Sequence, residues 1–224
     1  KEHEVKSSFV KQAFIGHEIV VKTDTWNKNE VQLMAFKENK NEIEFTYLLP
    51  FSSKRALIET TVFSSSPSLK VIERRHQTLL KKYGQYSIQR KEKAIIPMAI
   101  ISPDDLRGVL KIGTSAGMVR ASSGYSMRRI ANWLLKLNYS EISINNLPQY
   151  KYQPSPLLNW LDKIFLNVIY NFPDKGPYLF VTLFSKANTS ALIRFLSDDA
   201  SKFDLINILL SMPKKIMLKG LFKK

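Results

Sequence analysis

Alternating apolar and polar side chains mark the first part of the chain as a series of β-strands. Strand-like runs extend over Val31–Phe36, Ile43–Leu49 and Arg55–Phe63. The turn-forming segments Asn39–Asn41 and Pro50–Ser53 separate these runs. A period of two between closely spaced turns predicts an antiparallel meander that buries one face of its sheet.

The apolar period changes to that of a helix after this segment. One helical stripe contains Leu69, Ile72, Leu79, Leu80 and Tyr83. The pair Ser66-Pro67 predicts an N-cap followed by proline at the first helical position, and Gly84 predicts a left-handed end. His76 falls in the same stripe, where we expect an ordinary packed helix residue. A further strand is predicted from Tyr86 to Pro97.

Helical spacing also dominates the last third of the chain. Apolar residues recur at i, i+3 and i+4 in Leu157, Leu161, Ile164, Phe165, Val168, Ile169 and Phe172. Further helical runs are Ala191–Leu196 and Phe203–Leu210, and a helical stripe from Ile130 to Leu137 precedes them. Val109–Ile112 reads as a short buried strand. Separate strand and helix regions predict an α+β chain.

Composition narrows the class of protein. The 224 residues, 44% of them hydrophobic, are enough for one or two domains, and the lack of cysteine excludes disulfides and Cys-ligated metal sites. The chain has 34 basic and 19 acidic residues, a net charge of +15, which favours a lipid headgroup surface or nucleic acid as a partner. We rank nucleic acid last and expect none to bind, because the basic residues are spread among apolar helices without a known reader motif.

A glycine-rich turn is the most informative local feature. Gly113 and Gly117 follow the predicted short strand, and a helical stripe begins after a loop that contains Gly124. Glycines let the backbone approach a ligand closely, and N–H groups near a helix N-terminus stabilise a phosphate or an electron-rich ring. Taken alone, the same pattern also fits an ordinary turn without a ligand.

With its neighbours, this turn resembles the flavin-dependent lycopene cyclases of the bacterial lycopene beta-cyclase type. That family carries a glutamate before an Ile-Pro-Met-like turn, then Gly-x-x-x-Gly, then a Ser/Thr-Gly-Tyr-Ser run that opens a helix. Here these features are Glu92 with Ile96–Met98, Gly113 with Gly117, and Ser123–Ser126. The resemblance extends over nearly the whole chain through Gln12–Gly16, Val31–Phe36, Leu57–Thr60, Asn171–Pro177 and Ile193–Asp199.

The resemblance implies a fold and a cofactor. The implied fold is α+β, with an antiparallel substrate-domain sheet of a flavin hydroxylase-like fold over residues 1–100, a return strand-turn-helix of the FAD domain over residues 101–137, and a helical C-terminal cap over residues 138–224. The implied cofactor is reduced FAD, with NAD(P)H as its reductant. The residues implied to bind it are Glu92, Pro97, Met98, Gly113, Ser115, Ala116, Gly117, Gly124, Tyr125 and Ser126.

The Gly-x-Gly-x-x-Gly turn that holds a dinucleotide does not occur in the sequence. The resemblance therefore implies a missing N-terminal FAD-binding segment. Lys1–Glu4 also reads as the middle of a longer chain, because it is polar and lacks an initiator methionine. We expect this chain alone to be inactive.

The same resemblance implies cyclisation of lycopene ends to β-ionone rings in carotenoid biosynthesis, without net redox change. The first acid of a Glu-Asp-Thr or Glu-Glu-Thr motif is thought to be catalytic in the family. Here that acid is Glu59, and Thr60 stands at the second acid. Cyclisation of one or both ends remains open, with β-rings favoured over ε-rings. The alternative function is a related FAD-dependent prenyl reductase or hydroxylase that acts on another apolar substrate.

Glu59 also suits an acid role from its own surroundings. A period of two puts it on one strand face with Leu57, Thr61 and Phe63. A carboxyl among apolar side chains is desolvated, which raises its pKa and keeps it protonated. An exposed strand glutamate is the alternative reading. We expect Glu44, on the neighbouring strand and off the apolar face, to tolerate replacement by glutamine.

No other set of residues predicts catalysis or metal binding. His3, His17 and His76 are scattered along the sequence and do not indicate a nucleophile-His site. Asp104-Asp105 and Asp198-Asp199 lack partners at metal-ligand spacing, so we expect a turn and a helix surface, respectively, and no metal ion.

The C-terminal segment from Ser201 to Lys224 combines six lysines and one acid with many apolar side chains. Helices of this composition fit a membrane interface, and lycopene resides in a bilayer. The most apolar stretch, Leu157–Phe172, is interrupted by Asp162 and Lys163, so no spanning helix is expected. We expect a cytoplasmic protein that is peripheral at the inner membrane. Core-packing helices with lysines in water are the alternative.

Overall fold

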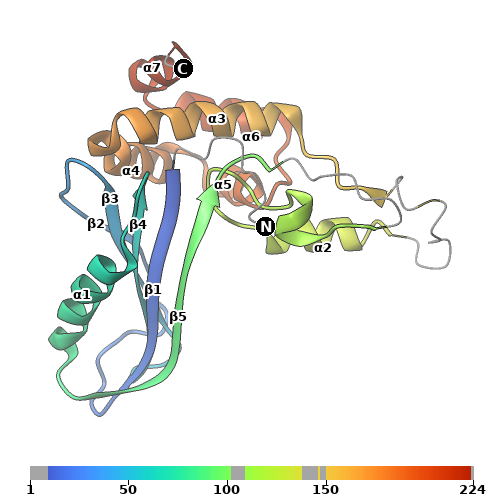
Figure 1. Cartoon of the computed structure of the whole chain (residues 1–224). Helices are drawn as coiled ribbons and strands as arrows, with labels where there is room; N and C mark the ends of the chain where they lie inside the picture. The colour runs from blue at the N-terminus through green and yellow to red at the C-terminus, as the bar shows by residue number, and fades with distance from the viewer. Residues whose placement is uncertain (1–9, 102–108, 138–145, 147–149, 223–224) are drawn as a thin grey trace. The chain divides into compact units, whose positions relative to one another are not determined.

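The computed structural model describes residues 10–101, 109–137, 146 and 150–222 (Figure 1). It shows the predicted α+β composition, in two compact units. Val10–Pro97 form one unit, and the described residues from Met98 onward form the other. The finer boundaries predicted near residues 100 and 137 stay predictions.

The first unit is built on a five-stranded sheet whose spatial order is β2-β3-β4-β1-β5. The strands are β1 Val10–Val21, β2 Gln32–Lys37, β3 Ile43–Pro50, β4 Arg55–Ser64 and β5 Tyr86–Met98. Strands β2, β3 and β4 form the predicted antiparallel meander, and β1 pairs with β4, also antiparallel. This order places β4, the central strand, between β1 and β3.

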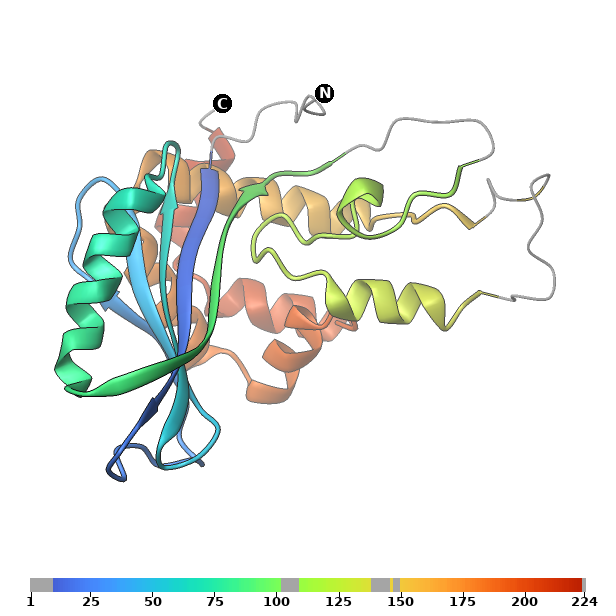
Figure 2. The same ribbon diagram turned by 60° about the horizontal axis from the view of Figure 1, so that its bottom comes forward.

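Helix α1, Leu69–Leu80, lies along one face of the sheet, and the short 3-10 helix η1, Lys81–Tyr83, follows it (Figure 2). The predicted apolar stripe is the face that packs on the sheet. Its contacts form two core clusters, one of Ala13, Ile15, Val62 and Ile72 and one of Ile19, Val21, Ile58 and Leu80. The predicted N-cap at Ser66 is wrong, because α1 begins two residues later than predicted and Ser68, with an extended backbone, is the N-cap.

Strand β2 departs from the predicted alternation. A register shift separates Gln32 from Ala35, and Met34 has a φ of 52°. Such a bulge changes the direction of the side chains that precede it, so they no longer follow the alternation of the paired residues after it. Val31 and Leu33 are consequently more than half exposed instead of lying on a buried face.

The second unit is helical in its described residues. Its elements are η2 Gly113–Ala116, α2 Met127–Leu134, α3 Pro156–Asn171, η5 Pro173–Lys175, α4 Gly176–Lys186, α5 Thr189–Leu196, α6 Lys202–Ser211 and α7 Lys214–Phe222. The predicted helical runs correspond to α2, α3, α5 and α6, and α4 and α7 lie in the region after Pro154 that was predicted to be helical throughout. The core contains Val168, Leu179, Leu183, Ala187, Leu192, Ile208 and Met212.

Local sequence explains several helix ends and one close helix contact. The Ser155 hydroxyl caps α3 by accepting the N–H of Leu158. Ser201 and Asp204 form a reciprocal capping box at the start of α6. Gly220 lets α7 lie against α3, because a Cβ there would come within 2.8 Å of the Ile164 carbonyl oxygen.

The predicted buried strand Val109–Ile112 is wrong. These residues have no strand structure, and Val109 and Ile112 are about half exposed. All five strands of the described sheet lie between residues 10 and 98, so this apolar run has no partner strand there. None of the helices in the described part of the chain is long and apolar enough to cross a membrane.

Candidate functional site

Glu59 lies in the middle of β4, on the face opposite α1. The strand register pairs it with Gly16 of β1 and with Tyr47 of β3. Thr61 and Leu57, the neighbours on the same face, are buried, while Glu59 itself is half-buried. Glu59 is therefore enclosed by strands on both sides, which differs from an exposed edge glutamate.

The surroundings of Glu59 favour its protonated form. Burial raises the pKa of this carboxyl, a hydrogen bond from Thr61 lowers it, and the charge of Glu92 raises it. The Thr61 hydroxyl donates that bond to Glu59 Oε1 at 2.7 Å. The net shift is upward, so the group holds its proton at a higher pH than a free glutamate.

A second carboxylate, that of Glu92, approaches the same place from β5. A Cβ placed on Gly16 would lie 2.9 Å from both Cγ and Oε1 of Glu92. The Glu92 side chain therefore occupies the space above Gly16, directly beside the position of Glu59. Arg90 Nη1 lies 2.8 Å from Glu92 Oε2 and balances its charge. Sequence reasoning assigned Glu92 to the cofactor and did not pair it with Glu59.

The opposite face of the sheet carries a buried polar chain that sequence reasoning missed. Thr60 Oγ1 lies 2.9 Å from His76 Nδ1, and His76 Nε2 lies 3.1 Å from His17 Nδ1. All three side chains are buried between α1 and the sheet. The two histidines are therefore not scattered in space, because the β1 register places His17 beneath α1 and next to β4.

Alternation along β4 separates Thr60 from Glu59. Successive strand residues point to opposite faces, so a residue at position 60 faces α1 and a residue at position 59 does not. A second acid at position 60 would thus lie on the other side of the sheet from Glu59. The second carboxylate on the Glu59 face comes from β5 instead.

Glu44 is not the freely replaceable position that the sequence pattern predicts. It is buried and pairs with Lys37 Nζ at 2.7 Å and with Arg75 Nη1 at 2.7 Å. Arg75 lies on α1 and also binds Glu42. The pattern failed because α1 covers this face and supplies a cation to strand β3, a contact that strand periodicity cannot predict.

The glycine turn forms η2 in the second unit. Gly113 and Gly117 have φ values of 66° and 71°, and the N–H groups of Gly117 and Met118 donate to carbonyls within the turn. A Cβ on Gly117 would lie 2.5 Å from the Ile101 carbonyl oxygen, so packing alone requires glycine there. Around Gly113, the nearest neighbour of such a Cβ is Ile130 Cδ1 at 3.9 Å, which leaves room for close approach of a ligand.

The predicted cofactor residues fall into separate groups. Gly113, Ser115, Ala116 and Gly117 share the η2 turn, whereas Gly124, Tyr125 and Ser126 share the turn before α2. Glu92 and Pro97 belong to the first unit, and Met98 begins the second. Ser115 and Tyr125 expose their side chains, while those of Met98 and Ala116 are buried in packing.

A buried arginine that sequence reasoning missed fixes the second turn. Arg120 is 1% exposed, and its Nε and Nη2 lie 3.3 Å from Asp162 Oδ1. Its guanidinium also donates to the Phe195 carbonyl and lies 4.0 Å from the centroid of the Phe195 ring. The Ser122 hydroxyl donates to the same Asp162 oxygen at 2.7 Å. The loop from Arg120 to Ser126 is thus tied to α3 and α5.

Asp198 and Asp199 do not form a helix surface as predicted. Asp198 follows α5 with a φ of 59°, accepts hydrogen bonds from Arg129 and lies 3.6 Å from Arg120 Nη1. Asp199 pairs with Arg128 on the surface. The chain must leave the helix here, which turns both carboxylates toward α2. Asp104-Asp105 lie outside the described residues.

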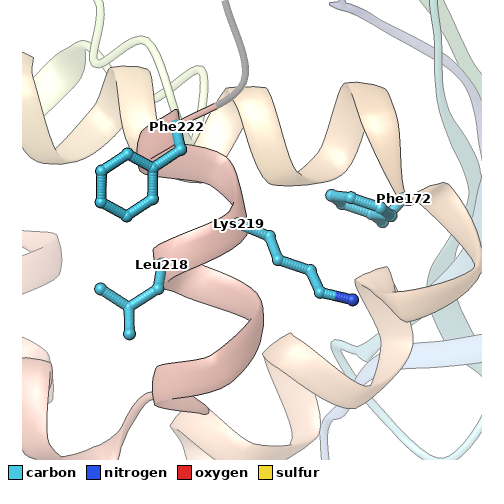
Figure 3. A pocket seen from close by; sticks show the side chains of 4 residues that line it. All are labelled: Phe172, Leu218, Lys219 and Phe222. Carbon is cyan, nitrogen blue, oxygen red and sulfur yellow. The ribbon is translucent and has the colours of Figure 1, made fainter.

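Helix α7 borders an open apolar pocket of about 490 Å³ in the C-terminal segment. Phe172, Leu218, Lys219 and Phe222 line it. Figure 3 shows the Lys219 side chain extending toward Phe172, whose ring centroid is 5.7 Å from Nζ. Exposed apolar side chains on α6 and α7 include Phe203, Leu210, Leu218 and Phe222. Within the described residues, no group of three or more His, Asp or Glu could hold a metal ion.

Comparison with known proteins points to one family. The family model described as "Lycopene cyclase protein" matches residues 2–221. The chain is 35% identical over 117 residues to a chloroplastic/chromoplastic lycopene beta cyclase of Narcissus pseudonarcissus, a match covering 50% of this chain and 22% of that protein. For the corresponding protein of Capsicum annuum the identity is 35% over 132 residues, with 54% and 26% covered.

A further relative carries a different name. The chloroplastic neoxanthin synthase of Solanum tuberosum is 29% identical over 133 residues, which cover 51% of this chain and 27% of that protein. This chain therefore matches only about a quarter of the length of each of these three relatives. Among solved structures, one match is a geranylgeranyl bacteriochlorophyll reductase-like protein from Thermoplasma acidophilum. The match covers 100% of this chain and 55% of that protein, with 9% sequence identity and a TM-score of only 0.41.

Proposed function

We propose that this chain, which belongs to the lycopene cyclase family, is the part of a lycopene beta-cyclase that holds the acid of the reaction. The family match over residues 2–221 confirms the resemblance that the sequence motifs indicate. The observation that carries the proposal is the position of Glu59, a half-buried carboxyl with a raised pKa at the family's acidic motif.

Ring closure needs an acid that can protonate carbon. A proton adds to a terminal double bond of lycopene, the neighbouring double bond attacks the resulting cation, and loss of a proton gives the β-ionone ring. The product is an isomer of the substrate, so no electrons are gained or lost. Such an acid must retain its proton at working pH, and desolvation beside a negative charge shifts the pKa of Glu59 upward, in the direction that this role requires.

Aromatic rings on the same sheet face support cationic chemistry. Phe45 stacks edge to face with Tyr47 at 5.2 Å and with Phe63 at 5.3 Å between ring centroids. Tyr47 is the direct neighbour of Glu59 in the strand register. Aromatic faces attract a nearby positive charge, so the partly exposed Tyr47 suits a substrate that becomes a carbocation after Glu59 gives up its proton, and the buried Phe45 and Phe63 rings would pack behind it.

The glycine turn fits part of a flavin site. The open space around Gly113 and the exposed hydroxyl-bearing side chains of Ser115 and Tyr125 would lie against the cofactor, while Gly124 and Ser126 lead to the first N–H groups of α2. Ala116 and Met98 would act only by packing behind this surface. Reduced FAD, kept reduced by NAD(P)H, would supply electrostatic stabilisation of the cationic reaction.

A membrane surface is the proposed route for the substrate. The exposed lysines Lys214, Lys215 and Lys219 lie beside exposed apolar side chains of α7, a combination that suits an anionic bilayer interface. Lys223 and Lys224, the last two of the six lysines in this segment, lie outside the described residues. We propose a peripheral location at the inner membrane on this basis.

The test is carotenoid analysis in a host that accumulates lycopene. Expression of the full-length protein that contains this chain should convert lycopene to γ-carotene if one end is cyclised, or to β-carotene if both are. Unchanged lycopene would contradict the proposal. Saturation of a prenyl chain or added oxygen would instead identify a reductase or a hydroxylase.

A further inference from the structure

Glu92 occupies the one place on β1 where the backbone carries no side chain. Gly16 is paired with Glu59 in the antiparallel register of β1 and β4. A methyl group on Gly16 would come within 2.9 Å of Glu92 Cγ and Oε1, so glycine is what allows the Glu92 side chain to lie across β1. The two carboxyl groups therefore share the same face and the same level of the sheet.

The two carboxyl groups have different partners. Glu92 is paired with Arg90 of its own strand at 2.8 Å, and Arg90 Nε lies 3.4 Å from Glu18. Glu18 is in turn bound by Arg55 Nη2 at 2.6 Å. Glu59 instead accepts a hydrogen bond from the uncharged hydroxyl of Thr61. The carboxylates of Glu92 and Glu18 are thus each paired with an arginine. Glu92 is the member of this row of ion pairs that lies beside Glu59.

We propose that Glu92 is a positioning residue that keeps the proton of this carboxyl pair on Glu59. Two neighbouring carboxylates resist simultaneous ionisation, and the proton stays with the one that lacks a cation. Arg90 pairs with Glu92, whereas Glu59 accepts a hydrogen bond from the uncharged Thr61 hydroxyl, so the proton resides preferentially on Glu59. This inference rests on the proposed function, because it assigns a role in preparing the acid of the same site.

The polar and charged groups on the Glu59 face come from all of the strands around it. Thr61 on β4, Tyr47 on β3 and Glu92 on β5 are the neighbours of Glu59, whereas Arg55 on β4, Glu18 on β1 and Arg90 on β5 form ion pairs farther along the same face. Among them, Glu92 is the carboxylate whose negative charge raises the pKa of Glu59. The strand order, rather than a contiguous motif, thereby brings a second acid to the face of Glu59.

The experiment is a titration of Glu59 in this chain with ¹³C-labelled glutamate, in which the carboxyl carbon resonance is followed against pH. Glu59→Gln identifies the resonance. In Glu92→Gln the midpoint of Glu59 should move to lower pH, because the neighbouring negative charge is gone. Glu73→Gln is the matched control, since it removes one carboxylate from α1, on the other face of the sheet, and should leave the midpoint unchanged.

The Gly16→Ala variant tests whether the position of the Glu92 carboxylate matters when its charge is unchanged. The added methyl group must displace the flexible end of Glu92 while its charge is retained, so the Glu59 midpoint should again move to lower pH. Adding Gly16→Ala to Glu92→Gln should produce no further shift. A folded Glu92→Gln variant with an unchanged Glu59 midpoint overturns the proposal. If that variant does not fold, an unchanged midpoint in Gly16→Ala overturns it.

The titration separates this inference from the proposed function. In the full-length enzyme, Glu92→Gln should shift the alkaline limb of the pH profile of cyclisation to lower pH, and Glu92→Asp should restore much of it. If Glu59→Gln retains full cyclisation, the proposed acid is wrong even where the titration shows coupling. If the titration shows no coupling while Glu59→Gln abolishes product, the role of Glu92 is wrong and the acid assignment stands.

Discussion

Nε2 of His76 lies 3.1 Å from Nδ1 of His17, inside the core between α1 and the sheet. Burial, together with the neighbouring charges of His17 and Lys37, lowers the pKa of His76 to about 4. Burial likewise lowers the pKa of His17. Both rings are therefore neutral in the folded protein near pH 7, and one must donate to the other.

This pair makes folding sensitive to mild acid. The pKa of a histidine in the unfolded chain is about 6.5, whereas that of folded His76 is about 4. The unfolded state thus binds a proton first, so the stabilisation is complete above pH 6.5 and is lost as the pH falls from 6.5 toward 4. We expect a loss of up to about 3 kcal/mol in the free energy of unfolding, measured by urea denaturation at a series of pH values.

His76→Gln provides the comparison for this prediction. Glutamine can still hydrogen-bond to Thr60 but does not titrate, so the variant should be less stable at pH 7 and show a flatter dependence on pH between 6.5 and 4. Parallel pH curves for the two proteins would show that His76 is not the group responsible.

Glu59→Gln should remove the acid and keep its shape. General acid catalysis contributes roughly 100- to 10,000-fold, so cyclised carotenoid should fall by that order in the full-length protein while flavin content and protein level are retained. Product is measured by chromatography of extracted carotenoids. Glu38→Gln is the control, because Glu38 is exposed next to β2. Near-normal β-carotene from Glu59→Gln would place the acid elsewhere.

Arg120→Met should destabilise the second unit. It would leave the buried Asp162 without its guanidinium partner and remove one cation from Asp198, which typically costs about 3–5 kcal/mol. Urea denaturation followed by circular dichroism measures the change. Arg128→Met is the matched control, because its pair with Asp199 is exposed and contributes less than about 1 kcal/mol. Equal stability of the two variants would contradict a structural role for Arg120.

Replacing the lysines of α7 should weaken binding to anionic vesicles. Each lysine near a charged surface contributes roughly 1 kcal/mol, so alanine at Lys214, Lys215 and Lys219 should reduce binding to phosphatidylglycerol vesicles by more than about 100-fold at low salt. Sedimentation with vesicles measures this. The matched control replaces Lys70, Lys81 and Lys82, which are exposed in the first unit. Equal binding to neutral phosphatidylcholine vesicles would support core-packing helices.

The predictable parts of the fold are those set by local periodicity. The stripe in α3 is the clearest case, because Leu161, Ile164, Val168 and Ile169 repeat at helical spacing and are all buried. Period two likewise predicts the face on which Glu59 lies. The bulge at Met34 could not be read from the sequence, since it depends on how β2 aligns with β3.

The unpredicted parts of the site depend on long-range pairing. Arg120 and Asp162 are 42 residues apart, and the pattern of either segment gives no indication of the other. Glu92 meets Glu59 only because β5 lies next to β1 and β1 next to β4. Strand order is a property of the whole sheet. Local sequence patterns therefore identify Glu59 but cannot show that Glu92 is its neighbour.

The bulge in β2 also has a consequence for pairing between chains. Strand β2 is an outer strand of the sheet. The apolar side chains of Val31, just before β2, and of Leu33, within it, are exposed. A flat outer strand offers a continuous row of N–H and C=O groups on which another chain can build amyloid-like pairing. The left-handed backbone at Met34 interrupts that row, so we expect the bulge to disfavour pairing of β2 with a strand of another chain.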